Sequence, residues 1–269
     1  MDTTKPQILL TNDDGIDSPG LWAAAEALSE LGYVWVAAPR DQASSTGRSM
    51  PLNSDGRITV QNLTVYGQEW TVHAVGGTPA QTVQHAIFEI IGQAPDLVVS
   101  GINYGLNIGL SVTVSGTVGA AMESYSLGIP SIAVSLETSQ EHFFTYSEEI
   151  DFSAAAYFTQ KFARHLLNPD LDLGTRFLKI EVPAEATRET EWAISRLCID
   201  RFYRVLKPEK RDWNEPFKLG FSVRDDFENL DSGTDLYTTM IERKVAVTPM
   251  TMDMTAPVSF ERMTAQFQD

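Results

Sequence analysis

The sequence predicts an α/β protein with a mainly parallel sheet, followed by a smaller β-rich region. Short apolar runs alternate with helical patterns through the first two thirds of the chain, as in βαβ units. The composition shifts after Pro183, where aromatic residues become frequent, and no helix of useful length is predicted from Thr187 to Phe221. We therefore expect a core at residues 1–184 and a C-terminal region at residues 185–269, with a final strand that returns to the core.

The first βαβ unit is predicted close to the N-terminus. Residues 8–10 form an apolar run typical of a buried strand, and residues 33–38 form a second one. A helix is predicted between them at residues 21–31, with Asp17 or Ser18 as its N-cap. The spacing of the three elements is that of one βαβ unit, so the two strands are expected to lie parallel.

Two adjacent carboxylates follow the first predicted strand, in the sequence Asn12-Asp13-Asp14-Gly15. In open α/β sheets, ligands bind at the carboxyl ends of the strands. Neighbouring carboxylates repel each other and resist burial, and a bound cation removes both costs. We therefore hypothesise that Asp13 and Asp14 hold a divalent metal ion. An ordinary turn followed by a helix cap is the alternative interpretation.

The rest of the predicted core continues this alternation. It comprises a hairpin of residues 57–66 and 69–75, a helix at 79–91 capped by Thr78, strands at 96–100, 130–136 and 177–182, a helix capped by Ser115 or Thr117, and a helix at 150–167. The C-terminal region is predicted to contain a hairpin of residues 191–199 and 201–206, and strands at 213–223 and 242–248. This region is a candidate oligomerisation arm, and extra strands folded onto the core are the alternative.

Three further polar loops are candidates for the same site. Residues 40–49 follow the second strand and are rich in serine. Residues 101–109 alternate three glycines with Asn103 and Asn107, whose amide groups suit a hard cation or an anion. Ser115-Gly116-Thr117 opens a helix, and a helix N-terminus with small side chains suits a phosphate. A flexible glycine loop and a plain capped helix are the alternatives for the last two.

Composition excludes several classes of partner. The net charge of −16 and the absence of a Lys/Arg cluster argue against binding duplex nucleic acid. There is no apolar run long enough to span a bilayer, so no membrane partner is expected. The N-terminus lacks the apolar segment of a signal peptide, and Cys198 is the only cysteine. These features together predict a cytoplasmic protein.

Several ordered motifs carry a resemblance to a known family. They are Asn12-Asp13-Asp14-Gly15, Pro19-Gly20, Ser44-Ser45-Thr46-Gly47, Gly77-Thr78-Pro79-Ala80, the asparagine loop from Ser100 to Gly109, Ser115-Gly116-Thr117 and Val245-Ala246-Val247-Thr248-Pro249. Taken in this order, they resemble the SurE family of survival-protein nucleotidases over nearly the whole chain.

The resemblance implies a Rossmann-like three-layer core, with the C-terminal region used to form homodimers or homotetramers. It implies metal-dependent hydrolysis of nucleoside 5′- and 3′-monophosphates, and in some members also of short polyphosphate. Matched position by position, the implied metal ligands are Asp13, Asp14, Ser44 and Asn103. Ser44 is preferred to Ser45 because it lies five residues after Pro39, as in the family pattern.

The sequence departs from the family at two places. Many members carry an acidic residue where this chain has Leu110 and Ser111, and Tyr or His where it has Val114. These positions lie outside the implied metal ligands. The departures therefore concern the pocket wall and the substrate preference.

The implied ligands are all oxygens, which favours one Mg²⁺ or Mn²⁺ per subunit over zinc. Asp13 or Asp14 can also accept a proton from the attacking water, and we favour Asp13 as this catalytic base. Phosphate oxygens are expected to bind Ser115, Gly116 and Thr117, with Asn12 and Asn107 as secondary candidates. The expected substrates are nucleoside monophosphates. The alternative function is a nucleotide or phosphate sensor that binds without turnover.

Overall fold

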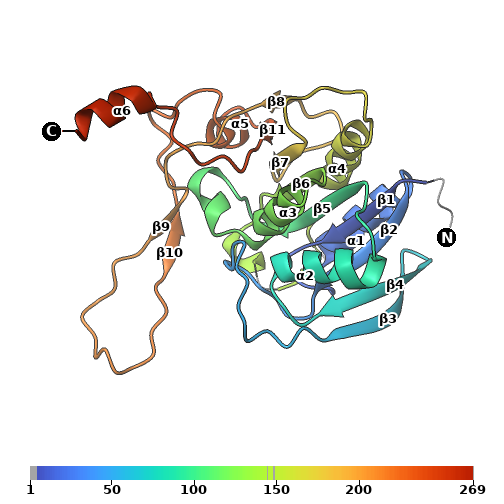
Figure 1. The fold of residues 1–269 in the computed structure, drawn as a ribbon. Helices are drawn as coiled ribbons and strands as arrows, with labels where there is room; N and C mark the ends of the chain where they lie inside the picture. The colour runs from blue at the N-terminus through green and yellow to red at the C-terminus, as the bar shows by residue number, and fades with distance from the viewer. Residues whose placement is uncertain (1–4, 144, 148, 269) are drawn as a thin grey trace.

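The computed structural model describes residues 5–143, 145–147 and 149–268. Within these residues the centre of the fold is a nine-stranded, mostly parallel sheet, ordered β3-β4-β2-β1-β5-β6-β7-β11-β8 (Figure 1). Its strands are β1 (Gln7–Thr11), β2 (Tyr33–Pro39), β3 (Ile58–Val65), β4 (Gln68–Val75), β5 (Leu97–Tyr104), β6 (Ser131–Leu136), β7 (Phe177–Val182), β8 (Trp192–Ile194) and β11 (Val245–Pro249). The predicted α/β fold is confirmed.

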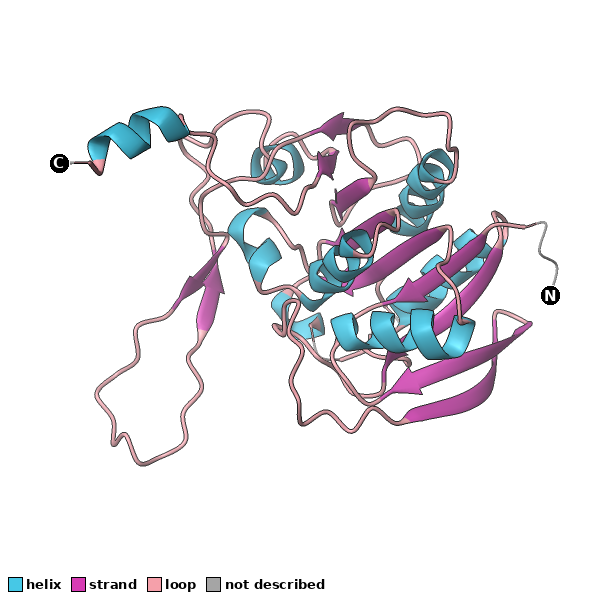
Figure 2. Cartoon of the chain, viewed as in Figure 1, coloured by secondary structure: helices cyan, strands magenta, loops and turns pink. Residues whose placement is uncertain are grey.

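Helices cover both faces of the sheet (Figure 2). They are α1 (Pro19–Ser29), α2 (Pro79–His85), which continues as a π-helical segment (Ala86–Ile91), α3 (Gly116–Ser126) and α4 (Ser153–Leu166). Successive strand residues point to opposite faces, so β1 contributes to two cores. Ile8 and Leu10 pack in the core that contains α1 and α4, whereas Leu9 packs with Val83 of α2 and Ala120 of α3.

The helix starts follow the predicted capping chemistry. Thr78 caps α2, as the sequence predicts, and it also forms a reciprocal capping box with Gln81. Ser115 caps α3 and accepts a hydrogen bond from the backbone N–H of Val118. Ser18 occupies the N-cap position of α1, although its side chain makes no capping hydrogen bond. These caps fix where the loops at the carboxyl edge of the sheet end.

The chain order of the strands creates a switch point beside β1. β1 pairs in parallel with β2 on one side and with β5 on the other, so the connections from these neighbouring strands diverge. Crevices at such points are the usual ligand sites of open α/β sheets. The loops that follow β1, β2 and β5 therefore meet at this edge.

β5 is longer than the sequence predicts. The strand was expected to end at Ser100, but it continues to Tyr104 with a register shift against β6 between Ser100 and Asn103. An irregularity of this kind lets a strand bend and re-aim a side chain without leaving the sheet. Asn103 consequently belongs to the end of a paired strand and not to a free glycine loop.

The C-terminal region differs from the sequence prediction. The predicted hairpin of residues 191–199 and 201–206 is wrong, because β8 pairs in parallel with β11 at the end of the main sheet. β9 (Tyr203–Val205) instead pairs with β10 (Phe221–Val223) in a separate two-stranded sheet, so the strand predicted at 213–223 is mostly loop. Two short helices, α5 (Asp235–Met240) and α6 (Phe260–Gln266), were not predicted.

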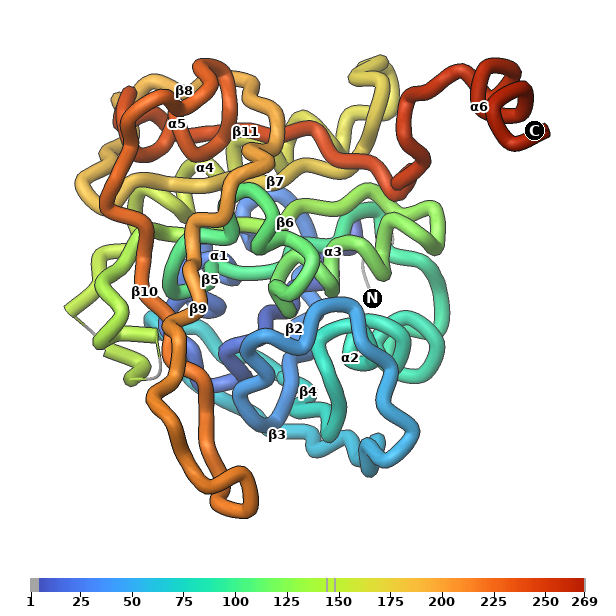
Figure 3. The backbone as a smooth tube through the Cα atoms, turned by 90° about the vertical axis from the view of Figure 1, so that its left-hand side faces the viewer, coloured from blue at the N-terminus to red at the C-terminus, as the bar shows by residue number. Residues whose placement is uncertain are grey.

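The β9–β10 hairpin carries a long loop that projects from the body of the molecule (Figures 1 and 3). Trp213 in this loop is 90% exposed, and Phe217 and Leu219 are exposed as well. The final helix α6 also lies away from the main sheet (Figure 1). Among the described residues, no helix combines the length and apolarity needed to cross a membrane.

Candidate active site

A cavity of about 530 Å³ opens at the edge of the sheet where the loops after β1, β2 and β5 meet. Its walls include Asp13, Ser44, Asn103, Asn107 and Ser115, all singled out from the sequence. Four separate polar loops are thus brought to one cavity by the parallel sheet. A volume of this size accommodates a small organic ligand.

Asp13 and Asp14 are almost fully buried, with 4% and 2% of their surfaces exposed. Burial raises the pKa of Asp13 to about 6, against the opposing effect of hydrogen bonds from Thr117 and Gly116. Burial and the neighbouring charge of Asp13 raise the pKa of Asp14 well above its usual value. Neither carboxylate forms an ion pair with a basic side chain in the described part of the chain. The pair therefore consists of two buried carboxyl groups without a protein counter-charge.

Gln42 links Asp14 to the second loop. Its Nε2 lies 3.3 Å from Asp14 Oδ1 and 3.1 Å from Ser44 Oγ, and it also donates to the Phe143 carbonyl at 2.9 Å. Asp14 Oδ2 accepts the backbone N–H of Tyr104 at 3.3 Å. Asp14 consequently sits behind the cavity wall, in contact with the loops that carry Ser44 and Asn103.

Asn103 faces the same cavity with its oxygen available. Its Nδ2 donates to the carbonyls of Tyr104 at 3.2 Å and Gly105 at 2.7 Å. No hydrogen bond to the Oδ1 atom is formed within the described residues, and the residue lines the cavity. The amide orientation thus leaves an acceptor, and not a donor, unused at a residue that lines the cavity.

The N-terminus of α3 contacts Asp13 directly. The Thr117 hydroxyl donates to Asp13 Oδ1 at 2.5 Å, and Thr117 itself is fully buried. A side chain at Gly116 would place its Cβ 2.7 Å from Asp13 Cβ, so only glycine permits this approach. Thr117 and Gly116 therefore hold the carboxylate, whereas Ser115 is the one of the three that lines the cavity.

The two secondary asparagine candidates differ in their surroundings. Asn12 is fully buried, and its amide exchanges hydrogen bonds with the backbone of Gly15 at 2.9 and 3.1 Å. It closes the turn that presents the two aspartates and is not part of the cavity wall. Asn107 does line the cavity, and its Nδ2 donates to Ser135 Oγ at 2.9 Å. Phosphate binding is therefore proposed below for Asn107 and not for Asn12.

Comparison with known proteins gives the family. A family model described as "Survival protein SurE" matches residues 8–204. A protein of Thermococcus gammatolerans named "5′-nucleotidase SurE" is 42% identical over 96% of this chain and 94% of its own length. One of Archaeoglobus fulgidus with the same name is 39% identical, and the alignment covers 95% of each chain.

The chain belongs to the SurE family.

Its fold agrees with that assignment. A structure titled "Crystal Structure of Sure Protein from Aquifex aeolicus" has a TM-score of 0.76 to this chain at 31% identity. The structural alignment covers 97% of this chain and 99% of the Aquifex chain. The similarity thus includes the C-terminal region as well as the sheet.

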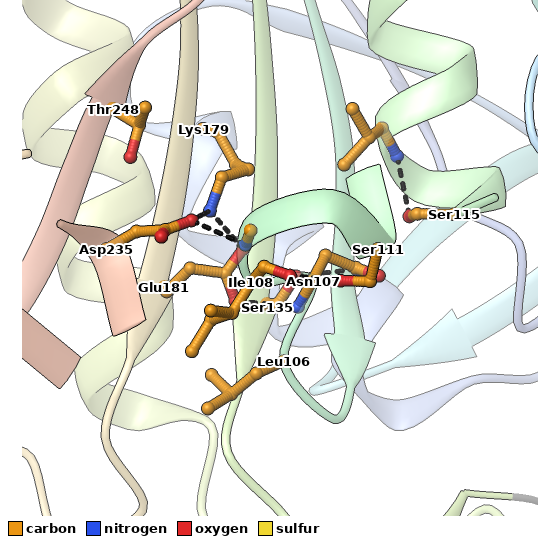
Figure 4. A network of polar contacts seen from close by, with 12 residues as sticks. Leu106, Asn107, Ile108, Ser111, Ser115, Ser135, Lys179, Glu181, Asp235 and Thr248 are labelled. Atoms are coloured by element: carbon orange, nitrogen blue, oxygen red, sulfur yellow. Dashed lines mark hydrogen bonds and ion pairs between the residues drawn. The ribbon is translucent and has the colours of Figure 1, made fainter. Parts of the chain in front are cut away.

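In this SurE-family chain, a buried three-residue cluster supports the asparagine loop (Figure 4). Lys179 Nζ lies 3.1 Å from Glu181 Oε1 and 3.0 Å from Asp235 Oδ2, and all three side chains are fully buried. Glu181 accepts the backbone N–H of Asn107 at 2.9 Å, and Asp235 accepts that of Gly109 at 2.8 Å. The cluster therefore fixes the backbone of the asparagine loop, which forms part of the cavity wall.

Lys179 is charged in this setting. Burial lowers its pKa, but the carboxylates of Glu181 and Asp235 more than offset this effect and raise the pKa above its usual value. Burial raises the pKa of Glu181, against the opposing charge of Lys179. The sequence carried a signal for this pair, because Lys179 and Glu181 are two residues apart and share one face of a strand predicted to be buried.

The remaining wall of the SurE-family cavity was not predicted from the sequence. It is formed by Phe143 from the loop after β6 and by Arg201, Tyr203 and Phe221 around the β9–β10 hairpin. Only the aromatic composition of the C-terminal region hinted at it. Residues from the two ends of the chain thus share one cavity.

The donor set fits a hard divalent cation. No cluster of three or more His, Cys, Asp or Glu side chains suited to a metal is found in the described residues, so the oxygens have to come from mixed residue types. Two buried carboxylates with raised pKa values and without a basic partner, together with the Ser44 hydroxyl and the Asn103 amide oxygen, are oxygen ligands of the type that Mg²⁺ and Mn²⁺ prefer. The residues present are therefore compatible with the ion that the resemblance implies.

Proposed function

We propose that this protein is a metal-dependent nucleotidase, which hydrolyses nucleoside 5′-monophosphates to nucleoside and phosphate. The observation that carries the proposal is the buried Asp13–Asp14 pair, which has no protein counter-charge and whose Asp13 lines a cavity of substrate size. The names of the relatives support the substrate class. Hydrolysis of 3′-monophosphates and of short polyphosphate is part of the same proposal.

Four residues are proposed to hold one Mg²⁺ or Mn²⁺: Asp13, Asp14, Ser44 and Asn103. When bound, such an ion supplies positive charge to phosphoryl oxygens and makes a water easier to deprotonate. In a chain of net charge −16, local positive charge at this point is needed to attract an anionic substrate.

The chain's own groups perform the remaining tasks. The Ser115 hydroxyl donates to phosphate oxygens from the N-cap of α3, and the Asn107 amide contributes from the opposite loop, since both residues line the cavity. Asp13 accepts the proton of the attacking water. The Thr117 hydroxyl, at 2.5 Å, keeps the Asp13 carboxylate in a fixed orientation for this transfer.

Release of inorganic phosphate from AMP, GMP and their 3′ isomers tests the proposal. We expect turnover with Mn²⁺ or Mg²⁺, loss of turnover with excess EDTA, and recovery when the ion is restored. Activity that is indifferent to chelation would contradict the metal role. Tight binding of AMP without phosphate release would identify a sensor and reject the enzyme.

A further inference from the structure

We propose that three aromatic side chains in the cavity form the nucleobase subsite, and that Arg201 binds the edge of the base. This inference rests on the proposed function, and it names the part of the site that selects nucleotides over other phosphate esters. The aromatic wall is defined as Phe143, Tyr203 and Phe221, all of which line the cavity that contains Asp13 and Ser44.

The aromatic wall is a connected and oriented set of rings. Phe143 and Tyr203 have ring centroids 6.4 Å apart at 79°, and Tyr203 and Phe221 have centroids 5.6 Å apart at 89°. The Tyr203 hydroxyl donates to the Leu106 carbonyl at 2.9 Å, which ties the wall to the asparagine loop. The rings are therefore held in place before a ligand arrives, which reduces the entropy lost on binding.

The wall is larger than phosphate hydrolysis requires. A phosphate group and one ion need only the rim around Asp13, yet the cavity extends to about 530 Å³ and ends in aromatic side chains. Phe221 keeps 41% of its surface exposed, so part of its ring is accessible to a flat partner. Bases of every kind stack on such rings, because each has an aromatic face. A base attached to the phosphate through ribose is the matching occupant.

Arg201 places a positively charged side chain at the cavity. It lines the cavity, is exposed, and forms no ion pair or hydrogen bond with any other described residue. Its position at the cavity, and not the lack of an ion pair alone, distinguishes Arg201 from other arginines of the chain such as Arg57 and Arg164, which do not line the cavity. The guanidinium group offers paired donors that match the O6 and N7 acceptors of guanine. Arg201 is therefore assigned to the base edge.

The test compares substrates with and without a base. Phe221→Ala is expected to lower kcat/KM for AMP and GMP by about 5- to 150-fold, the usual loss when one stacking ring is removed. Activity on ribose 5-phosphate, which has no base, should stay within about twofold. Phe221→Trp keeps a ring and should retain activity on the nucleotides. An equal loss on both substrate types, or no loss on either, would overturn the proposal.

The matched control is Phe217→Ala. Phe217 lies in the same hairpin and is 50% exposed, but it packs on Arg211 outside the cavity. The Phe217→Ala substitution should leave kcat/KM for all substrates unchanged. This control separates a loss of stacking from a general disturbance of the hairpin.

Arg201→Gln distinguishes the base edge from the phosphate. We expect about a tenfold loss for GMP, a smaller loss for AMP and none for ribose 5-phosphate. A uniform loss on all three would place Arg201 at the phosphate and reject its assignment to the base. If the wild-type protein hydrolyses no substrate, the proposed function fails; the same comparison of Kd values by calorimetry still tests the subsite.

Discussion

Two pairs of buried carboxylates lie close to the same cavity, and they are balanced differently. Glu181 and Asp235 share the fully buried Lys179 and accept backbone N–H groups of the asparagine loop. Asp13 and Asp14 are buried to a similar degree, but their partners in the described residues are neutral donors only. The Glu181–Asp235 pair is therefore neutralised in part by a lysine of the protein, whereas the Asp13–Asp14 pair has no positively charged partner.

The comparison separates a structural cluster from a binding site. A buried charge that is hydrogen-bonded and paired within the protein is compatible with a stable fold, whereas an uncompensated one costs folding free energy. The second arrangement, at the switch point of the sheet, is the one expected at the cation site that we propose. The five predictions below test this contrast, in order of decreasing expected effect.

Asp13→Asn should separate activity from folding. Removing one carboxylate from the proposed metal site is expected to lower kcat/KM for AMP by roughly 10³-fold or more. The apo protein should be at least as stable as wild type, because one of two repelling buried charges is lost. Phosphate release and thermal unfolding measure the two effects. Near wild-type turnover with Mn²⁺ present would reject the assignment of Asp13.

Lys179→Met, in contrast to Asp13→Asn, should mainly lower the stability of the fold. The substitution leaves Glu181 and Asp235 without their cation, and breaking a buried ion pair in this way costs about 3–5 kcal/mol of unfolding free energy. Urea unfolding measures this loss. Lys179→Met combined with Glu181→Gln is the control, and it should recover part of the stability because a buried negative charge is removed with the positive one.

The stability of the Lys179→Met variant should depend on pH, and the sign of this dependence can be predicted. Burial already raises the pKa of Glu181 above its usual 4.5, and the loss of Lys179 raises it further. The folded variant then binds a proton more tightly than the unfolded chain, so its stability rises as the pH falls through the raised pKa toward 4.5. The deficit relative to wild type is therefore largest near neutral pH. A deficit independent of pH would argue that Lys179 acts through packing alone.

Adding Mn²⁺ should stabilise the wild-type protein and not Asp13→Asn. An ion at about 100 times its Kd adds roughly 2.7 kcal/mol to the unfolding free energy, which corresponds to a Tm increase on the order of 5 °C. Thermal unfolding with and without EDTA gives the comparison. Equal shifts in the two proteins would show that the ion binds elsewhere.

Thr117→Val should have the smallest effect of the five. It removes the hydroxyl that donates to Asp13 Oδ1 while keeping the size of the side chain. Partners that orient a metal ligand in this way are worth about 10- to 100-fold in metal affinity. Thr117→Ser, which retains the hydroxyl, is the control and should bind Mn²⁺ nearly as wild type does. The result distinguishes a residue that orients Asp13 from one that binds phosphate itself.

The sequence predicted the part of the site that follows from the parallel sheet. The apolar run of β1 places Asp13 and Asp14 at a carboxyl end, and the same rule applies to the loops with Ser44 and Asn103. The contacts between side chains of different loops could not be predicted from the sequence. Gln42 lies next to Asp14 and Thr117 bonds Asp13 only because separate segments meet in space, and no local pattern records such a meeting.

The C-terminal region was harder to predict for a physical reason. Its strands are three residues long, apart from β11, so alternation of polar and apolar residues has little length over which to appear. Their partners are also distant in sequence, since β8 pairs with β11 across about fifty residues and not with its neighbour β9. The aromatic wall depends on this non-local pairing, which is why composition alone hinted at it.

The position of β11 in the sheet has a consequence for synthesis of the chain. β11 lies between β7 and β8, although it is made after both of them. Until residues 245–249 leave the ribosome, β7 has an open edge on that side and β8 has no partner in the sheet. An open edge invites pairing with other chains. The nascent protein is therefore most prone to aggregation just before its last strand arrives, and a chain truncated before Val245 should be recovered mainly as insoluble material.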